Sequence, residues 1–253
     1  MWTRQPSSDW LVTHRQVWTK KRGLRQVYTR WFHLLRAACA PGAPVVELGC
    51  GPGFLKTVYP DVIATDTVDN PFADRMVDAA ALPFGEGEVA NLVMLDVFHH
   101  IADPLQFVRE AARVLQPGGR IVMIEPWIGL AGSFFYRYVH HEQCDLRADP
   151  AAPWRDGPKD AMQGNMALPY LYFRSGGYLE HIDLPLAVVE RQPFAALPWL
   201  LSGGFQPFSL VPAALVGPLE AVDRCLSLLP SLTASRCLIV VEKGAGRPSR
   251  RVL

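Results

Sequence analysis

Apolar and polar residues alternate along this chain in blocks that predict strands and helices by turns. Short apolar runs bounded by glycine, proline or aspartate are typical of strands buried on both faces. Such runs predict strands at residues 45–48, 62–65, 75–77, 89–95 and 120–124. After the fourth run, Asp103 and Pro104 form a helix start, and apolar residues at helical spacing follow as far as Leu115. Strands that alternate with helices indicate a parallel sheet, so we expect an α/β fold.

The first part of the chain has a helical pattern. From Trp10 to Ala38 apolar residues recur three or four positions apart, which predicts an amphipathic stretch that Gly23 divides into two helices. Lysine and arginine residues gather around this division. Two roles fit that charge: a solvated helix face, or a basic lip that attracts an anionic substrate or lipid headgroups.

Composition narrows the class of protein. The 253 residues are 49% hydrophobic and 19% charged, as in ordinary globular proteins, and a formal net charge of +1 gives no general attraction to nucleic acid. The five cysteines are scattered without a CxxC pair, which favours reduced thiols over a disulfide framework. No apolar run follows the first residues, so we expect no secretory signal and a cytoplasmic location.

The first predicted strand runs directly into three glycines at alternate positions, Gly49, Gly51 and Gly53. Such a loop lets the backbone turn sharply and lets a ligand approach without a Cβ in its way. A dinucleotide motif would need a glycine where Phe54 stands, and the Gly-Lys-Ser/Thr of a P-loop does not occur. Together with Glu47, the loop resembles motif I of class I S-adenosylmethionine (SAM)-dependent methyltransferases. A tight turn without a ligand is the alternative.

An aspartate follows each of the next two predicted strands. Asp66 can accept hydrogen bonds from both hydroxyls of a ribose, and Asp78 can accept one from the exocyclic amine of adenine. The alternative role for each is to cap a strand end or a turn.

Four further blocks in a fixed order resemble the type-11 family of SAM-dependent methyltransferases. They are Ala81-Leu82-Pro83-Phe84, Asn91-Leu92-Val93, Phe98-His99-His100-Ile101 and Arg113-Val114-Leu115-Gln116-Pro117-Gly118-Gly119. The resemblance covers roughly residues 44 to 127 and implies SAM as the cofactor. It places the three glycines at the methionine end of SAM, Asp66 at the ribose and Asp96 beside the sulfonium tail. The implied cofactor-binding residues are Glu47, Gly49, Gly51, Gly53, Asp66, Asp78, Ala79 and Asp96, with Asp78 and Ala79 framing the adenine.

Two features depart from the family pattern. Asn91 stands where an aspartate is usual, and only eleven residues separate Asp66 from Asp78. The helix that usually lies between those two positions is therefore expected to be short or missing.

The resemblance also implies a Rossmann-like, doubly wound sheet of seven strands, mostly parallel with an antiparallel edge hairpin. Residues 186–190 and 237–242 fit the two hairpin strands. We expect an N-terminal helical segment over residues 1–40 and a single methyltransferase domain over 41–253, with insertions at about 128–183 and 191–236. Residues 192–219 carry no charge, but their five prolines argue against a membrane span. The remaining roles for this stretch are a lid, a wall of the acceptor pocket, or peripheral membrane contact.

Methyl transfer to oxygen benefits from a nearby general base, and histidine fits that role best near neutral pH. His99 and His100 follow the fourth strand and Glu125 ends the fifth, which makes these three the candidate catalytic residues. His140 and His141 are weaker rivals. A metal site is conceivable from the residue types of His140-His141-Glu142 and Cys144-Asp145. None is expected, because the adjacent His140 and His141 do not easily point toward one ion.

The sequence therefore predicts a SAM-dependent methyltransferase that acts on a small-molecule or lipid- or sugar-linked acceptor, with oxygen favoured as the methylated atom. The alternative is a non-catalytic SAM-fold protein that binds SAM or a partner chain. Nucleic acid is not an expected partner, because no Asn/Asp-Pro-Pro-Tyr/Phe motif follows the fourth strand. The sequence leaves the acceptor and the oligomeric state open.

Overall fold

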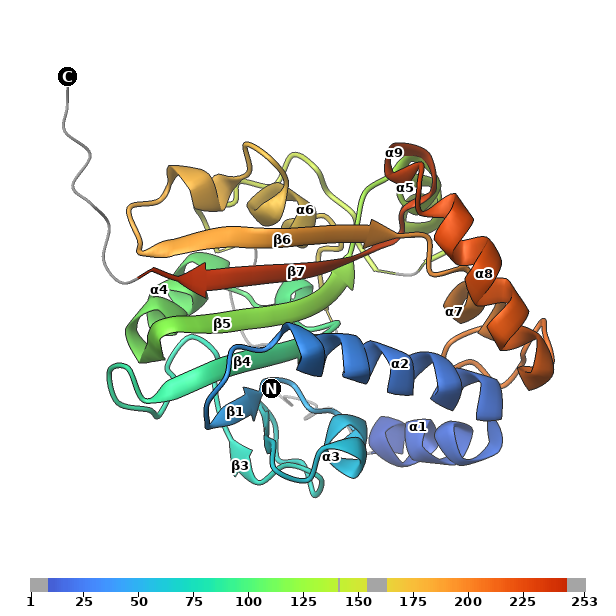
Figure 1. Ribbon diagram of the computed structural model, residues 1–253, viewed down its shortest axis with the longest axis horizontal. Coiled ribbons are helices and arrows are strands. Elements are labelled where there is room, and N and C mark those ends of the chain that lie inside the picture. Colours follow the sequence, from blue (N-terminus) through green and yellow to red (C-terminus); the bar gives the residue numbers. More distant parts are fainter. Residues whose placement is uncertain (1–8, 141, 154–162, 245–253) are drawn as a thin grey trace, which may run out of the picture.

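The computed structural model describes residues 9–140, 142–153 and 163–244 and confirms the expected fold class. A seven-stranded sheet has the strand order β3-β2-β1-β4-β5-β7-β6 (Figure 1). The strands are β1 (Val45–Glu47), β2 (Ile63–Asp66), β3 (Arg75–Met76), β4 (Val89–Leu95), β5 (Leu115–Pro126), β6 (Leu186–Phe194) and β7 (Arg236–Lys243). The strands β1 to β5 pair in parallel, whereas β7 is antiparallel to both β5 and β6. The edge hairpin predicted from the family is thus confirmed.

Helices and short turns connect these strands. The described helices are α1 (Asp9–Lys20), α2 (Arg22–Ala38), α3 (Phe54–Val58), α4 (Pro104–Val114), α5 (Leu130–Tyr138), α6 (Leu168–Phe173), α7 (Leu197–Ser202), α8 (Val216–Leu226) and α9 (Pro230–Thr233). Three 3-10 turns accompany them: η1 (Phe98–His100), η2 (Tyr178–His181) and η3 (Ala213–Leu215). The predicted division of the first helical stretch falls at Lys21, two residues before Gly23.

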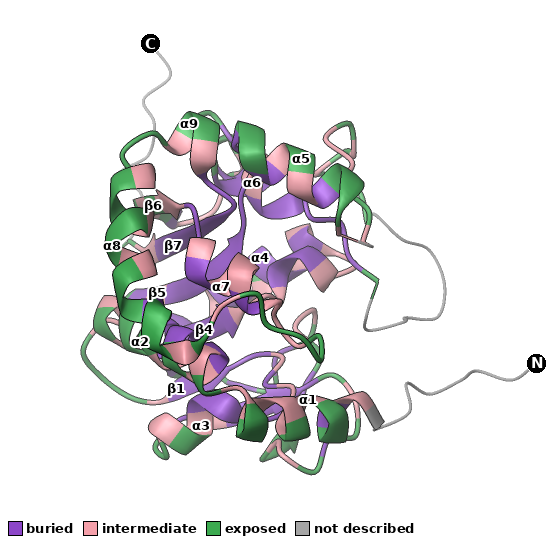
Figure 2. Ribbon diagram, turned by 90° about the vertical axis from the view of Figure 1, so that its right-hand side faces the viewer, coloured by how far each residue is buried: buried purple, intermediate pink, exposed green. Residues whose placement is uncertain are grey.

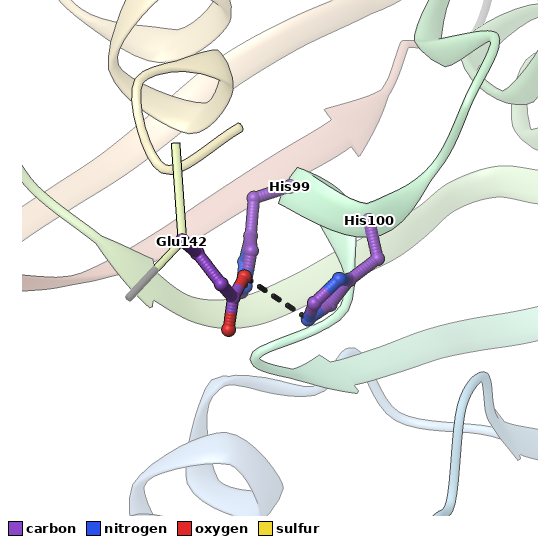
Figure 3. Close-up of side chains that lie close together, drawn as sticks. All are labelled: His99, His100 and Glu142. Atoms are coloured by element: carbon purple, nitrogen blue, oxygen red, sulfur yellow. Dashed lines mark ion pairs between the residues drawn. The ribbon is translucent and has the colours of Figure 1, made fainter. Parts of the chain in front are cut away.

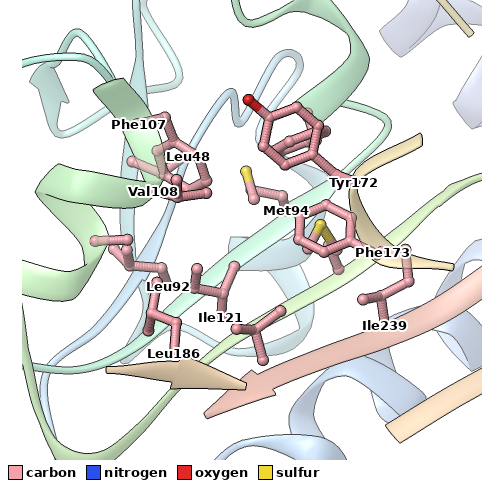
Figure 4. Close-up of a cluster of buried hydrophobic side chains, with 14 of the residues drawn as sticks. Leu48, Leu92, Met94, Phe107, Val108, Ile121, Tyr172, Phe173, Leu186 and Ile239 are labelled. Atoms are coloured by element: carbon pink, nitrogen blue, oxygen red, sulfur yellow. The ribbon is translucent and has the colours of Figure 1, made fainter. Parts of the chain in front are cut away.

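The sheet is covered on both faces because successive residues of its central strands point to opposite sides. Leu92 and Met94 of β4 join one core, which includes Phe107 of α4 and Phe173 of α6 (Figure 4). Val93, between them, joins the second core, which the apolar stripe of α2 covers. The inner surfaces of the helices are buried and their outer surfaces exposed (Figure 2). This arrangement is the doubly wound sheet that the resemblance implied.

Only β4 has its predicted bounds; the fifth and sixth strands differ most, and β6 runs to Phe194, four residues beyond its predicted end. The fifth strand begins at Leu115, five residues before the predicted start, and contains the segment Pro117-Gly118-Gly119. The final strand begins at Arg236, which lies opposite Pro126 of β5 in the antiparallel register. Because β7 begins where β5 ends, Arg236 lies at the carboxyl edge of the parallel strands. Residues 67–74, between β2 and β3, contain no helix, as the short spacing predicted.

The uncharged stretch 192–219 forms the end of β6, then α7, η3 and the start of α8. Among the residues that the structure describes, none of the helices has both the length and the apolar character needed to span a bilayer. The division of the chain at residue 40 and the two insertions stay predictions.

Candidate functional site

The glycine loop follows β1 at the carboxyl edge of the sheet. Gly49, Gly51 and Gly53 have φ angles of +65°, +50° and +72°, a region that residues with a Cβ seldom adopt. A Cβ on Gly49 would lie 2.7 Å from Cγ2 of Val97. Glycine is therefore required at this position both for backbone conformation and for space.

Asp66 ends β2 beside this loop and holds it in place. Its Oδ2 accepts hydrogen bonds from the Gly51 N–H at 3.0 Å and from the Asn70 side-chain amide at 2.8 Å. Its Oδ1 accepts one from the Thr67 N–H at 2.8 Å. An ionised carboxylate can accept about four hydrogen bonds, so capacity remains on Oδ1 for a ligand hydroxyl.

Asp78 follows β3, the strand next to β2, so the two aspartates stand at neighbouring strand ends. The side chain of Asp78 is exposed, and its Oδ1 accepts a hydrogen bond from the Ala80 N–H at 2.9 Å. Ala79 is half-buried. The turn is thus ordered by Asp78 and open toward solvent.

Glu47, the acidic residue of the motif, is buried at the end of β1. Its Oε2 has no hydrogen-bond partner among the described residues. Burial, together with the nearby charge of Asp66, raises the pKa of Glu47 to about 8. This carboxyl is therefore largely protonated at neutral pH.

Helix α1 covers the glycine loop with aromatic side chains. A Cβ built on Gly51 would lie 3.5 Å from the ring of Trp10. The ring of Trp18 stacks on that of Phe54, just after the loop, with centroids 4.0 Å apart. Part of the surroundings of the loop thus comes from outside the motif-bearing segment.

Asp96, directly after β4, has a φ of +57° and forms an ion pair with Arg236 at the start of β7. Arg236 is 3% exposed, and its guanidinium carbon lies 4.4 Å from the centroid of the Trp199 ring. Burial lowers the pKa of Arg236 to about 10. Arg236 was not among the site residues expected from the sequence. Its position could have indicated a role, because it stands at the start of β7, which pairs antiparallel with β5.

His99 and Glu125 form a buried pair at the same edge, 2% and 0% exposed. The Nδ1 of His99 lies 2.7 Å from Oε2 of Glu125. The other oxygen of Glu125, Oε1, accepts hydrogen bonds from the N–H groups of Val97 and Phe98 at 2.8 and 2.7 Å. Desolvation raises the pKa of Glu125 to about 7 and lowers that of His99 to about 3, which keeps the imidazole neutral.

Glu142, after α5, completes this cluster, whereas the sequence suggested it only as a neighbour of His140 and His141 in a conceivable metal site that was not expected. Its Oε2 lies 3.7 Å from Nε2 of His99 and 3.9 Å from Nε2 of His100. The ring of His140 contacts Phe135 instead, and His141 lies outside the described residues. The structure thus brings the three expected catalytic residues together and adds a second carboxylate.

Comparison with known proteins agrees with this geometry. A family model described as a methyltransferase domain matches residues 46–123, which contain the glycine loop, the strands β2 to β4 and most of β1 and β5. The chain contains a class I SAM-dependent methyltransferase domain. Its cofactor is accordingly SAM. The glycine loop leaves its backbone open to a ligand, and Glu47, Asp66 and Asp78 supply acidic groups at three neighbouring strand ends.

Two curated relatives and one solved structure illustrate how far the likeness extends. A Mycolicibacterium smegmatis protein named "Probable S-adenosylmethionine-dependent methyltransferase" is 33% identical over 114 residues, which are 40% of this chain and 42% of that protein. The 27-O-demethylrifamycin SV methyltransferase of Amycolatopsis mediterranei is 27% identical over 103 residues, 32% of this chain and 38% of that protein. The chain thus spans about two-fifths of the length of these relatives.

The solved structure shares the fold over nearly its whole length. It is a complex between the Haloferax volcanii Trm112 methyltransferase activator and a methyltransferase. The match has a TM-score of 0.53 with 18% identity, and it covers 94% of this chain and 96% of that one. At this identity the likeness concerns the fold of the methyltransferase domain.

Two surfaces are formed by residues outside the methyltransferase motif. Near the glycine loop, Phe205 of the uncharged stretch has its ring centroid 5.9 Å from that of Phe54 and 4.2 Å from that of His14. Between α2 and α8, a hollow of about 580 Å³ is lined by residues that include Arg22, Arg25, Arg30, His33 and Glu220. Arg30 pairs there with Glu220, so part of the basic charge is used within the fold.

Proposed function

We propose that this chain is an enzyme that transfers the methyl group of SAM to an oxygen atom of a small or lipid-linked acceptor. The observation that carries the proposal is the glycine loop with Glu47, Asp66 and Asp78 at the ends of three neighbouring strands. Ligands of open α/β sheets bind beyond the carboxyl ends of the strands, where these groups lie. In the proposal, the glycines adjoin the methionine end of SAM, Asp66 binds the ribose, Asp78 and Ala79 frame the adenine, and Asp96 lies beside the sulfonium tail.

Methyl transfer is an in-line displacement in which the sulfonium leaves as a neutral thioether. Positioning of the two reactants therefore supplies much of the catalysis. Transfer to a hydroxyl also requires that its proton be removed. His99, His100 and Glu125 lie together at the edge after β4 and β5, and their role as proton acceptors stays a prediction. The low pKa of His99 makes that imidazole a weak base.

Two observations support a small or amphipathic acceptor. The Amycolatopsis relative is named for methylation of a demethylated oxygen of rifamycin SV, a small molecule. In this chain, Trp199 and Phe205 of the uncharged stretch offer apolar surface near Arg236 and the glycine loop. An anionic lipid-linked acceptor, or peripheral membrane contact, fits the basic hollow between α2 and α8.

Calorimetric titration of the purified chain with SAM and with S-adenosylhomocysteine tests the cofactor site. Asp66→Ala should weaken binding by about 1–3 kcal/mol, the cost of losing hydrogen bonds to a buried partner. Asp69→Ala, an exposed aspartate three residues later, is the matched control and should bind as the wild type does. If the wild type binds neither molecule, the proposed function fails.

A second experiment addresses the acceptor. The chain is incubated with methyl-labelled SAM and with either the soluble or the detergent-extracted lipid fraction of cells. Label in lipids supports the lipid-linked acceptor, and label confined to soluble metabolites excludes it. SAM binding without any label transfer would favour the non-catalytic alternative, in which the domain binds SAM or a partner chain.

A further inference from the structure

Three side chains from two separate segments converge near the carboxyl edge of the sheet (Figure 3). His99 and His100 belong to η1, and Glu142 follows α5. The carboxylate oxygen lies 3.7 and 3.9 Å from the two Nε2 atoms, and the imidazole centroids are 4.1 Å apart. One potential ligand atom from each residue lies within 4.8 Å of the other two.

A second carboxylate orients one of these ligands. Glu125 lies 2.7 Å from Nδ1 of His99, and two backbone N–H groups fix its other oxygen. Metal-binding histidines commonly donate their second ring N–H to a carboxylate in this way. With the proton on Nδ1, the Nε2 lone pair of His99 faces a carboxylate oxygen of Glu142. Two acceptors that face each other at 3.7 Å require a proton or a cation between them.

The spacing favours a cation at this position. A separation of 3.7 Å is too long for a single hydrogen bond between Nε2 of His99 and Oε2 of Glu142, whereas an ion between the two atoms fits it. The segment around Gly164 closes over the cluster, since a Cβ there would lie 2.8 Å from both Glu142 Oε2 and His99 Cδ2. The Asn165 N–H donates to the His99 carbonyl at 2.9 Å, which holds the segment in place.

We propose that His99, His100 and Glu142 bind one divalent transition-metal ion, with Zn²⁺ the best match. Zinc bonds of 2.0–2.2 Å at a tetrahedral angle place neighbouring ligand atoms about 3.4 Å apart. The observed 3.7 and 3.9 Å differ from that spacing by a few tenths of an ångström. Two nitrogen ligands argue against Mg²⁺ and Ca²⁺, which prefer oxygen.

A neighbouring group is less suited to a metal. Asp96, His99 and Glu125 also have ligand atoms within 4.8 Å of one another. However, Arg236 already neutralises Asp96, and Glu125 accepts two backbone hydrogen bonds. The cation is therefore placed on the other side of the His99 ring, toward Glu142.

Three protein ligands leave a fourth position on a tetrahedral zinc ion. An acceptor hydroxyl bound there would lose its proton more readily, so a weak base nearby would suffice. This role rests on the proposed function, whereas binding of the ion does not.

Zinc titration of the full chain, freed of metal with a chelator, tests the proposal by calorimetry. We expect one zinc ion per chain and, with Co²⁺ as a spectroscopic probe, the intense visible bands of a four-coordinate site. Glu142→Gln and His100→Asn should each weaken binding by roughly tenfold or more. Glu190→Gln and His181→Asn, which replace exposed residues of the same types, should leave it unchanged.

Cysteine thiolates are the competing zinc ligands, so Cys225→Ser, at the exposed cysteine, is a further control. Absence of zinc binding by the wild type overturns the proposal. Equal binding by folded Glu142→Gln and His100→Asn, or loss of binding in Cys225→Ser, does so too. SAM titration of the same samples separates the two hypotheses: SAM binding without zinc binding removes the metal site alone, and zinc binding without SAM binding removes the proposed function alone.

Discussion

Arg236 donates to the carboxylate of Asp96 and so joins the start of β7 to the end of β4 across 140 positions of sequence. The guanidinium is almost fully buried and stacks on Trp199, whereas Asp96 keeps part of its side chain exposed. A carboxylate held in this way is fixed at the edge where the cofactor is expected. Its contact with the sulfonium tail stays a prediction.

Removal of Asp96 should destabilise the fold because it leaves a buried guanidinium without its counter-charge. We expect Asp96→Ala to lower the free energy of unfolding by about 3–5 kcal/mol, measured by denaturant titration. The double variant Asp96→Ala/Arg236→Met should lose less than the sum of the two single variants, since no charge then remains buried. Additive losses would show that the pair contributes nothing.

Alanine at Gly49 should disrupt the loop more than backbone strain alone predicts. Gly87, with a φ of +66° and no described atom within 4 Å of the place a Cβ would take, is the matched control. There we expect alanine to cost about 1–2 kcal/mol of stability. Gly49→Ala should cost more and abolish SAM binding, because its Cβ meets Val97. The variant Gly49→Ala/Val97→Ala should recover part of the stability, and no recovery would refute the steric explanation.

The ammonium group of Lys21 ties the break between α1 and α2 to the uncharged stretch. Its Nζ lies 2.5–3.0 Å from the carbonyl oxygens of Ser202, Gly204, Gln206 and Phe208, so its three N–H groups are shared among four acceptors. Lys21→Met should lower the free energy of unfolding by about 1–3 kcal/mol and speed hydrogen exchange in residues 202–208. Lys21→Arg should restore little of this stability, because a planar guanidinium does not fit a pocket of carbonyl oxygens arranged around a compact ammonium. Lys20→Met, at an exposed position, is the control.

Protonation of Glu47 should couple SAM binding and stability to pH. Its pKa rises from 4.5 to about 8 on folding, so unfolding releases a proton between these values. The contribution of Glu47 to the free energy of unfolding is therefore fully present below pH 4.5 and is lost as the pH rises through about 8. Between these values the free energy of unfolding falls by at most about 1.4 kcal/mol per pH unit. Glu47→Gln should flatten this dependence.

The positive charges of SAM favour the ionised form of Glu47. We therefore expect SAM binding at pH 7 to release a proton and SAM affinity to rise toward pH 8. Calorimetry in two buffers of different ionisation enthalpy measures that proton. Glu47→Gln should abolish the release and Glu86→Gln, at an exposed position, should not. Equal proton release in the wild type and in Glu47→Gln would contradict the assignment.

Local signals explain what could be predicted from the sequence. The bounds of β4 match the apolar run 89–95, and Asp103 caps α4 by accepting the Gln106 N–H, as its position before a proline indicated. These features depend on neighbours in sequence. The glycine loop likewise has the positive φ angles that its composition favours.

Tertiary structure brings in contacts that the sequence did not indicate. Arg236 was missed and reaches the site because β7 runs antiparallel to β5. Glu142 was considered only beside His140 and His141, and it lies near His99 because the chain after α5 returns to η1. His99 and His100 were expected only as candidate bases, whereas a metal site was weighed, and rejected, only at His140 and His141. A 3-10 turn directs both Nε2 atoms toward the same carboxylate oxygen. Backbone geometry of this kind leaves no periodic trace in a sequence.

The aromatic cover that α1 places over the glycine loop limits how the protein can be shortened. A version reduced to residues 22–253 would keep α2 and every motif residue, yet it would expose the ring of Phe54 and one side of Gly51 to water. Such a fragment would still be recognised by sequence while it held SAM less well. The segment by which the domain is identified is thus smaller than the segment that packs around its glycine loop, and acceptor screening should use the entire chain.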